Sequence, residues 1–460
     1  MPAKLEREIF ELLGSVPKID IHTHLSADRL MARGLDDLLL YHMLNTELYA
    51  ASHLEGEHPD GARVPEDRTE ALALARIEPA VRALPRIRNT SLSWVFRRII
   101  ADLYDWKGEL DSTNWRKLHE RIKERNAADG ERARTILRDL GVRRVGTEIT
   151  RRADGRGDDI FQYALEWAFF ARTQWDRAGA SGQADMPLFE LERTWGAAGP
   201  QPPLPVTMRR EERPALERTI RRAEDLRGAV RHYAELIPRS SVLATAQHLS
   251  TDIDYRPVTE AELETAIRNR EHAGARELGV YASAILEAFL TELERRGGGP
   301  GSPLVFQFSL GAESLPFESA CRLRSETVAD LARLVAAHPD LRFMCFNASR
   351  AAHQSLCSLV RELPNLSLGG FWWHSFFPSA LAAMAQERLD MVPLVKQCDY
   401  MSDAYVVDWV YGKDLLIRRA YAGVFARQVE EGQYSMADVE AIAHGIFLDS
   451  PRELLGFTLP

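Results

Sequence analysis

Two histidines separated by one residue, His22 and His24, are the groups in this chain best suited to metal chemistry. They end the stretch KIDIHTHL, residues 18–25, in which Ile19 and Ile21 alternate with polar residues, and such alternation predicts a strand. Side chains two positions apart on a strand point to the same side, so both imidazoles should project together. Two neutral imidazoles make half of a divalent metal site. The alternative is a pair of exposed histidines at the end of a strand.

A carboxylate that could complete such a site follows the last apolar strand candidate, residues 394–400. Asp403 lies just beyond it, between the small residues Ser402 and Ala404. This carboxylate could ligate a metal or take a proton from a group bound to that metal. Asp399 lies earlier, where it could point into the sheet, so we place it second. Either aspartate could instead be a loop residue or the N-cap of a helix.

Tyr41, His42 and His248 are further candidates for acid–base or ligand chemistry. Tyr41 and His42 lie in an apolar helical stretch after the first strand, and a Tyr–His pair near a metal could move protons. Because neighbouring residues on a helix do not share a face, only one of them should reach the site, and a partly buried aromatic pair is the alternative. His248 ends another strand candidate, where a ligand and a structural histidine are equally good interpretations.

Polar and aromatic groups near two other strand candidates could contact a substrate. They are Gln307, Ser309, Trp372, Trp373 and His374. Gln307 and Ser309 alternate with phenylalanines, so both side chains should project to the same side of the strand, into the interior of a barrel. The two tryptophans could wall a sugar-sized pocket, although packing in the core is an equally good interpretation. The histidine could donate hydrogen bonds, and the two glycines before the tryptophans would let the backbone approach a ligand closely.

Eight short apolar strands, most of them separated by helical segments such as 161–178 and 212–236, predict the architecture that must position these residues. The strand candidates are 18–25, 142–149, 188–195, 242–248, 304–310, 341–347, 366–371 and 394–400. Strand–helix alternation implies a parallel sheet with helices outside, and eight units imply a closed (β/α)8 TIM barrel, an α/β fold. Active sites of such barrels form at the C-terminal ends of the strands. An open doubly wound sheet is the alternative, but no Gly-x-Gly-x-x-Gly motif follows the first strand.

A long stretch of helical periodicity separates the first strand from the second. It includes one apolar face over residues 38–48 and continues to residue 140. We therefore expect residues 28–140 to form a helical insertion, and residues 1–27 and 141–460 to form the barrel.

The composition is that of a globular protein with a large core: 460 residues, 45% hydrophobic and 27% charged, with a formal net charge of −9. The charge is spread along the chain without a basic stripe, so we expect no nucleic-acid partner. No run approaches the roughly 20 apolar residues of a membrane span, and the charged N-terminus has no signal segment, so we expect a cytoplasmic protein without a membrane partner. The four cysteines form no Cys-x-x-Cys pair, which favours a reducing compartment. A homo-oligomer is compatible with the sequence.

These residues together resemble the amidohydrolase superfamily, whose barrels carry His-x-His on the first strand, and within it the uronate isomerase (glucuronate isomerase) family. The stretches that carry the resemblance follow in the same order along most of the chain. They are SVPKIDIHTHL (15–25), VGT (145–147), FQFSLGA (306–312), GGFWW (369–373) and the tail from 418 to 432.

Three positions differ from the pattern of that family. The family's eighth strand ends in Thr-Asp-Ser-Arg, whereas residues 402–405 read Ser-Asp-Ala-Tyr, so Tyr405 replaces an arginine. Ser309 stands where a histidine is expected, and the family's His-Tyr pair is reversed, or displaced, as Tyr41-His42. An arginine suits a carboxylate substrate because its guanidinium group can donate hydrogen bonds to both carboxylate oxygens. The candidates to replace it are Arg350, Arg151 and Arg152.

The resemblance implies one divalent metal ion held by His22, His24 and Asp403, with zinc as the first choice and manganese as the alternative. It also implies that the small-molecule substrate is a sugar acid of the glucuronate or galacturonate type, whose aldose and ketose forms are interconverted by proton transfer. Asp403, Tyr41 or His42 would supply the base or its partner acid. A metal-dependent hydrolase or decarboxylase on the same barrel is the alternative. A barrel that only binds a ligand is a third interpretation.

Overall fold

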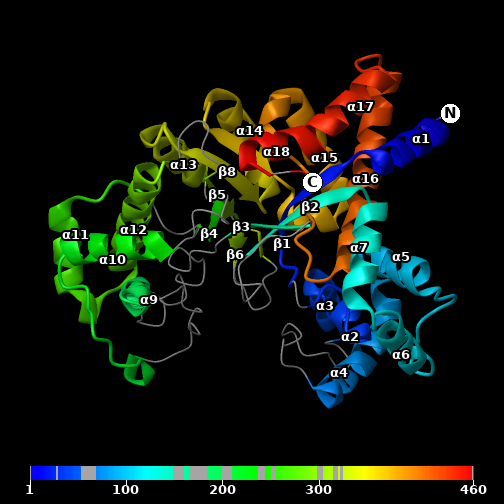
Figure 1. Ribbon diagram of the computed structural model, residues 1–460, viewed down its shortest axis with the longest axis horizontal. Helices are drawn as coiled ribbons and strands as arrows, with labels where there is room; N and C mark the ends of the chain where they lie inside the picture. The colour runs from blue at the N-terminus through cyan, green and yellow to red at the C-terminus, as the bar shows by residue number, and fades with distance from the viewer. Residues whose placement is uncertain are drawn as a thin grey trace.

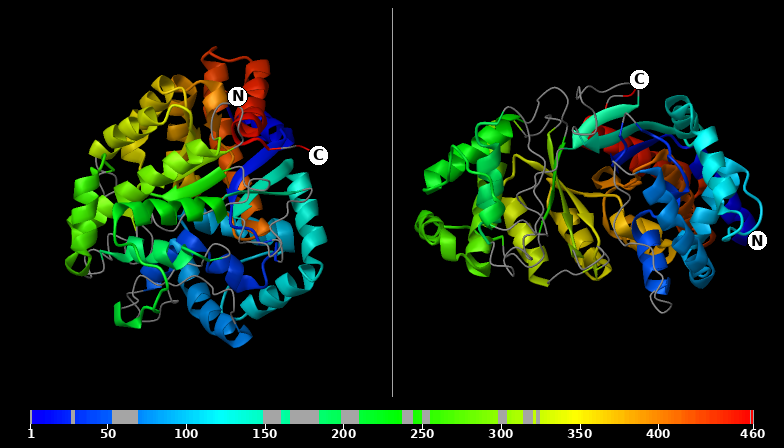
Figure 2. Two further views of the ribbon diagram at one scale, coloured as in Figure 1. Left: turned by 60° about the vertical axis from the view of Figure 1, so that its left-hand side comes forward. Right: turned by 90° about the horizontal axis from the view of Figure 1, so that it is seen from below.

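The computed structural model describes residues 2–26, 29–52, 69–148, 160–165, 184–197, 210–236, 244–249, 255–297, 304–313, 320–321, 325–457 and 459. The strands lie in the middle of the molecule, with helices α10–α12 (223–295) on one side and α2–α7 (35–139) on the other (Figure 1). Figure 2 shows the strands between these two groups of helices from two further directions.

The described part of the chain contains eight strands that pair in parallel, in two sheets. The first sheet has the order β1-β2-β3 and the second the order β10-β9-β8-β5-β4. The strands are β1 (Lys18–Thr23), β2 (Val142–Glu148), β3 (Phe161–Leu165), β4 (Ala244–His248), β5 (Val305–Leu310), β8 (Arg342–Asn347), β9 (Leu366–Gly369) and β10 (Gln397–Cys398). The short strands β6 (Ala312–Glu313) and β7 (Ala320–Cys321) form a separate antiparallel pair. Parallel pairing with intervening helices confirms the expected α/β class.

Helices precede, separate and follow these strands. Those before β3 are α1 (Pro2–Ser15), α2 (Leu35–Leu39), α3 (His42–Ser52), α4 (Glu70–Ala83), α5 (Ser91–Tyr104), α6 (Trp115–Arg125) and α7 (Asp129–Asp139). Those between β3 and β10 are α9 (Met186–Thr194), α10 (Ala223–Leu236), α11 (Glu260–Arg268), α12 (Ala275–Arg295), α13 (Ser325–Ala337), α14 (His353–Glu362) and α15 (Pro378–Met391). The chain ends in α16 (Val407–Glu430), α17 (Met436–His444) and α18 (Ser450–Leu455).

The two sheets meet where the chain beyond β10 returns to β1. The amide of Ile21 donates a hydrogen bond to the carbonyl of Tyr400 at 3.2 Å, and the amide of Asp403 donates to the carbonyl of His22 at 3.1 Å. The ends of the first and last strands are therefore neighbours, as a barrel requires. At the opposite seam β3 and β4 are adjacent, but no strand pairing between their described residues is present. Complete closure into a (β/α)8 barrel stays a prediction.

The third strand differs from the one expected from the sequence. The sequence predicts this strand at residues 188–195, but residues 188–194 lie in helix α9 and Trp195 is its C-cap. Pro187 lies in the first turn of this helix. Proline is favoured there because its fixed φ suits a helix and its missing N–H has no partner to lose. The actual strand is β3, at the start of the expected helix 161–178. Both segments are short and apolar, and periodicity does not separate a buried strand from a buried helix at that length.

The expected helix at residues 38–48 is two helices, α2 and α3, with a break at Leu40 and Tyr41. The later expected helix, 212–236, begins only at Ala223, and the last strand is limited to Gln397–Cys398 because a 3₁₀ turn occupies residues 394–396. The first strand ends at Thr23, so His24 lies just beyond it.

Helices α2–α7 lie in sequence between β1 and β2, and they are the described elements of the expected insertion 28–140. Their buried side chains share one hydrophobic core with α1 and α16, rather than forming a core of their own. The indole N–H of Trp409 on α16 donates to the carbonyl of Leu38 at 3.2 Å, which ties α16 to α2. The division into barrel and insertion stays a prediction. Of the described helices, none has the length and apolar character that crossing a membrane would require.

Candidate metal centre

His22, His24 and Asp403 converge at the seam between the two sheets. The Nε2 atoms of the two histidines are 3.4 Å apart. Oδ1 of Asp403 lies 3.3 Å from Nε2 of His22 and 3.2 Å from Nε2 of His24. Two imidazole nitrogens and a carboxylate oxygen thus face one point, and this is the donor set of an open three-residue site for a divalent ion.

The backbone of the segment that follows β10 is held against β1, and this brings the carboxylate of Asp403 to the two imidazoles. Asp403 donates its amide to the carbonyl of His22, and the amide of His24 donates to the carbonyl of Ala404 at 2.9 Å. Asp403 has a φ of 54°, in the left-handed region that non-glycine residues seldom adopt. The hydroxyl of Tyr41 donates to the carbonyl of Asp403 at 3.0 Å and so supports this conformation.

Burial and neighbouring charges have opposite effects on the pKa of Asp403. Burial alone would raise its pKa, but the hydrogen bonds and charges of His22 and His24 outweigh burial and hold the pKa well below its usual range. The carboxylate is only 2% exposed, so its charge is screened little by water. A buried anion beside two imidazoles fits a divalent cation, which would replace the protons as the partner of all three groups.

A second group of possible ligand residues, Glu70, His119 and Glu120, is present among the described residues. Nδ1 of His119 accepts a hydrogen bond from the amide of Leu35 at 3.2 Å, so the proton of the neutral ring is on Nε2. Nε2 then donates to Glu70 at 2.9 Å. Glu70 and Glu120 are exposed, and Glu70 also pairs with Lys123, so this group links α4 to α6 as a surface hydrogen-bond cluster.

An aromatic wall adjoins the metal centre. The ring of Tyr405 stacks on His24 with centroids 4.5 Å apart and planes at 19°. The ring of His42 lies 4.9 Å from Tyr405 on a tilted plane. Tyr405 and His42 are both half-buried. Tyr405 therefore stands beside the candidate ligand His24, at the position where the resembled family has an arginine.

Tyr41 and His42 both reach this region, contrary to the expectation that only one of them could. The break between α2 and α3 is the reason: Tyr41 precedes α3, and His42 starts it with a φ of 39°. Without continuous helical geometry the two rings are 4.8 Å apart. Tyr41 is buried and stacks on Trp409 at 4.3 Å, whereas His42 faces Tyr405.

The stretch after β9 forms the 3₁₀ helix η8 (Trp372–Phe376). Trp372 and Trp373 are each 6% exposed and belong to a hydrophobic cluster with Ile19 and Phe346. Core packing therefore accounts for their position. His374 bonds the carbonyl of Ala348, and burial lowers the pKa of His374 to about 4, so this ring is neutral and its buried Nε2 has no partner among the described residues.

The glycines before η8 serve packing within the protein rather than approach to a ligand. A Cβ on Gly369 would lie 2.2 Å from the ring of Phe346, and one on Gly370 would lie 2.4 Å from Met401. Gly370 also has a φ of 33°. A side chain at either position would therefore clash with the core.

The other expected substrate contacts lie in different surroundings. Gln307 is fully buried on β5, where its amide contacts the sulfur of Met344 at 3.4 Å. Ser309, also on β5, is 1% exposed. Arg350 is exposed at the start of a 3₁₀ turn after β8. The side chain of His248, together with Arg151 and Arg152, lies outside the described residues.

Asp399 faces away from the metal centre into a buried ion pair. Its carboxylate accepts a hydrogen bond from Arg388 at 2.5 Å and another from the hydroxyl of Tyr421. Burial raises the pKa of Asp399, although Arg388 and Tyr421 oppose this. This aspartate is a partner of Arg388, which also donates to the carbonyl of Gly370 at 2.5 Å.

Sequence reasoning missed Asp20, on β1 two residues before His22, and Lys413, whose Nζ donates to the hydroxyl of Ser375; both side chains are fully buried. Asp20 accepts the amide of Ser402, the neighbour of Asp403, at 3.0 Å. Lys413 lies on α16 within the apolar run VDWVYGKDLL, residues 407–416. The available signal was a lysine among apolar residues of this run, because a buried charge needs a partner.

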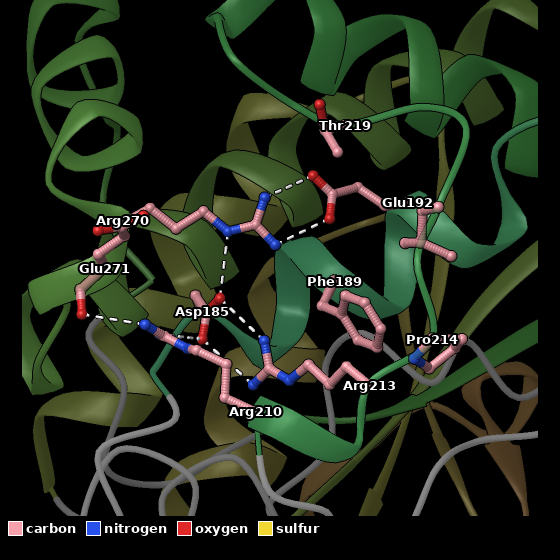
Figure 3. A pocket seen from close by; sticks show the side chains of 10 residues that line it. Asp185, Phe189, Glu192, Arg210, Arg213, Pro214, Thr219, Arg270 and Glu271 are labelled. Atoms are coloured by element: carbon pink, nitrogen blue, oxygen red, sulfur yellow. Dashed lines mark hydrogen bonds and ion pairs between the residues drawn. The ribbon is translucent and has the colours of Figure 1, made fainter.

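A cavity of about 360 Å³ lies among α9, the 3₁₀ turn 210–212 and the 3₁₀ turn 270–272, and Figure 3 shows its ionic lining. Arg270 binds both oxygens of Glu192 at 2.5 and 2.8 Å. Arg210 and Arg213 each donate to Asp185 at 2.9 Å, Arg213 donates a second bond to it at 3.2 Å, and Arg270 donates one at 3.1 Å. The arginines are thus engaged with carboxylates of the protein, and the cavity contains none of the metal-centre residues.

Comparison with solved structures relates this chain to the uronate isomerases by fold. A uronate isomerase from Thermotoga maritima superposes with a TM-score of 0.72 at 13% identity, covering 98% of this chain and 97% of its own. Glucuronate isomerase from Caulobacter crescentus gives 0.72 at 15% identity, with 100% and 95% coverage. A uronate isomerase from Bacillus halodurans gives 0.67 at 16% identity, with 100% and 98% coverage.

A protein from Lactobacillus casei described as a proposed metal-dependent hydrolase also shares the fold, with a TM-score of 0.54, 14% identity and 97% coverage of both chains. No family model and no curated protein matches the chain by sequence. At these identities the likeness shows the fold, which spans the whole chain, and the activity has to be argued from the site.

Proposed function

We propose that this chain is a metal-dependent isomerase that interconverts the aldose and ketose forms of a sugar acid, of the glucuronate or galacturonate type. The convergence of His22, His24 and Asp403 within 3.2–3.4 Å of one another carries the proposal. The shared fold with three uronate isomerases supports the choice of reaction.

The three converging side chains would hold one divalent ion, with zinc as the first choice and manganese as the second. A bound ion would supply an electrophile that stabilises negative charge on a substrate oxygen. His22 and His24 provide neutral nitrogen donors, and Asp403 provides the negative charge that balances the ion in a buried site. Tyr41 holds the backbone of Asp403 in place, so it acts as a positioning residue.

His42 is the candidate base for the proton transfer. Aldose–ketose interconversion moves a proton between C1 and C2 of the open-chain sugar through an enediol. An imidazole suits this task because its ordinary pKa lies near neutral pH, and His42 is half-buried beside Tyr405. His42 takes the proton from C2 and returns it to C1, and the hydroxyl proton of O2 passes to O1 through water, so the aldehyde at C1 becomes an alcohol and the alcohol at C2 becomes a ketone. The ring of Tyr405, which stacks on His24, would orient the sugar chain.

The test is turnover of sugar acids by the metal-loaded protein in deuterated water. We expect glucuronate or galacturonate to give a ketose by NMR, with deuterium at the carbon that receives the proton. The double variant His22→Ala/His24→Ala is the inactive control, and His119→Ala is a matched control that should retain turnover. Absence of ketose from every sugar acid tried, with the metal bound, would contradict the isomerase.

A metal-dependent hydrolase is the second candidate, and the shared fold with the Lactobacillus casei protein favours keeping it. In such an enzyme a metal-bound water is the nucleophile and a nearby carboxylate takes its proton. Asp403 is positioned for that role as well. Release of acid from an amide, ester or lactone, without ketose formation from sugar acids, would decide for the hydrolase.

A further inference from the structure

The direction of the Asp403 carboxylate depends on an unusual turn of the chain. Asp403 has a φ of 54°, and a residue other than glycine keeps such a conformation only where its surroundings fix it. Its Oδ1 lies 3.3 Å from Nε2 of His22 and 3.2 Å from Nε2 of His24. The hydrogen bonds that hold this turn therefore decide where the candidate metal ligand points.

The bonds between β1 and the segment after β10 begin as a parallel ladder and then change step. The amide of Ile21 donates to the carbonyl of Tyr400 at 3.2 Å. In a regular parallel ladder the N–H and C=O of one residue bond to two residues that are two positions apart, so the amide of Ser402 would donate to Ile21. Instead the next amide, that of Asp403, donates to the carbonyl of His22 at 3.1 Å.

The side chain of Asp20 accepts the amide that takes no part in this ladder. Its Oδ1 lies 3.0 Å from the backbone nitrogen of Ser402, and both residues are fully buried. Asp20 lies on β1 two residues before His22, and both side chains reach the segment after β10. Because a buried amide without an acceptor is costly, the carboxyl oxygen replaces the carbonyl that a regular strand would offer.

Two further bonds hold the residues around Asp403. The hydroxyl of Tyr41 donates to the carbonyl of Asp403 at 3.0 Å, and the amide of Ala404 donates to Oγ of Ser402 at 3.3 Å. Tyr41 thus fixes the chain after the ligand residue, whereas Asp20 fixes the chain before it. The second of these contacts comes from the strand that also carries the histidines.

We propose that Asp20 is a positioning residue of the candidate metal centre, whose carboxyl oxygen takes the amide of Ser402 and so sets the change of step that turns Asp403 toward the two histidines. This inference rests on the metal site of the proposed function. The bond requires an acceptor oxygen and no particular charge, because a carboxylate, a neutral carboxyl group and an amide all offer one. Asp20 differs in this from Asp403, which would contact the ion itself.

Replacements at position 20 separate the acceptor from the charge. Asp20→Asn keeps an oxygen facing Ser402, and its NH2 group takes the place of Oδ2, which has no hydrogen-bond partner among the described residues. Asp20→Leu has a similar shape and removes the acceptor. Asp20→Ala leaves space in which a water can accept the amide, so this variant should fold even where the leucine variant does not.

Asp408 provides a matched control within the same fold. It is also a fully buried aspartate, and its Oδ2 accepts the backbone amide of Ala32 at 3.0 Å. Its other oxygen accepts a bond from the hydroxyl of Tyr104. Neither partner is next to a metal ligand in the chain, so Asp408→Leu should lower stability and leave the zinc affinity of the folded protein unchanged.

The experiment is zinc titration of the metal-free full-length chain by competition with a chelating dye, for wild type and these four variants. We expect Asp20→Leu and Asp20→Ala to bind zinc about 10–100-fold more weakly, the range for loss of a group that orients a metal ligand. Asp20→Asn should stay within about threefold of wild type because it retains the acceptor. The cobalt(II) absorption spectrum, which reports the arrangement of the ligands, should shift only for the leucine and alanine variants at position 20.

Wild-type zinc affinity in folded Asp20→Leu or Asp20→Ala overturns the inference. A loss in Asp20→Asn as large as that in Asp20→Leu also overturns it, because the charge would then be what matters, and Asp20→Asn decides alone if the other two variants do not fold. An equal loss in folded Asp408→Leu overturns it as well, since any buried bond would then have this effect.

The same experiment separates this inference from the proposed function. A wild-type chain that binds no zinc, manganese or cobalt removes the metal site, and with it both proposals. The expected order of affinities, together with no turnover of any sugar acid, supports the positioning role of Asp20 and contradicts only the isomerase.

Discussion

His22 and Asp403 meet twice, once through the backbone and once through the side chain. The amide of Asp403 donates to the carbonyl of His22 at 3.1 Å, and Oδ1 of Asp403 lies 3.3 Å from Nε2 of His22. The backbone bond joins the two ends of the strand order and sets the distance between the side chains. The candidate metal centre is thus assembled by the same contact that joins the two sheets.

Replacement of either histidine by alanine should remove the metal. Each imidazole supplies one of three converging donor atoms, and loss of a direct ligand should exceed the ~10–100-fold loss of affinity that follows removal of an outer-shell partner. Metal content after dialysis against a weak chelator measures this. His119→Ala is the control, because that histidine is engaged with Glu70 and Leu35. Wild-type metal content in His22→Ala or His24→Ala would remove the site.

Asp399→Asn should lower stability and keep the metal, whereas Asp403→Asn should lose the metal and change stability less. Asp399→Asn breaks the buried pair with Arg388 and should destabilise the fold by about 3–5 kcal/mol, as measured by urea unfolding. The folded fraction of this variant should still bind metal. Asp403→Asn should lose metal with a smaller effect on the stability of the metal-free chain, because two neutral imidazoles remain in place of an ion pair. Loss of metal from folded Asp399→Asn would show that the wrong aspartate has been assigned.

Tyr41→Phe should loosen the backbone of Asp403 without removing the metal. It removes the hydrogen bond to the carbonyl of Asp403, which is worth about 0.5–1.5 kcal/mol, and leaves the ring stacked on Trp409. We expect a loss of stability of this size in urea unfolding, retained metal and reduced turnover. Complete loss of metal from Tyr41→Phe would instead make this tyrosine a ligand or a support on which the site depends.

His338 should make stability depend on pH. Burial alone would lower the pKa of His338, but the carboxylates of Glu287 and Glu294, at 3.5 and 3.2 Å, outweigh burial and raise it. The folded state then binds the proton more tightly than the unfolded state, so this contribution is fully present below a pH of about 6.5 and is lost as pH rises through the raised pKa. Because both glutamates are partly exposed, we expect up to about 1 kcal/mol.

The measurement for His338 is urea unfolding of wild type and His338→Gln at several pH values from 5.5 to about 9. The difference in unfolding free energy should be largest at the acid end and should shrink with rising pH. A difference that grows with pH would mean that the neutral form of this histidine stabilises the fold.

Local pattern was sufficient for the features that depend on neighbours in the chain. Alternation in residues 18–25 predicted a strand with two histidines on one side, and the structure places their Nε2 atoms 3.4 Å apart. Repeated strand–helix alternation predicted a parallel α/β fold, which the strand pairing confirms. Local pattern failed where two elements have the same period and length, so residues 188–194 were assigned as a strand although they form α9.

Contacts between segments that are distant in the chain decide the other features of the candidate site, and the spacing of residues in the sequence does not encode these contacts. The helix-face argument for Tyr41 and His42 failed because the chain breaks between α2 and α3, and the two rings then face the same region. The roles of Asp399 and Asp403, four residues apart, differ because Arg388 binds one and β1 binds the other. Lys413 is buried and meets Ser375 and Phe376 only when α16 packs against η8, since burial and the partners of a charge arise from packing.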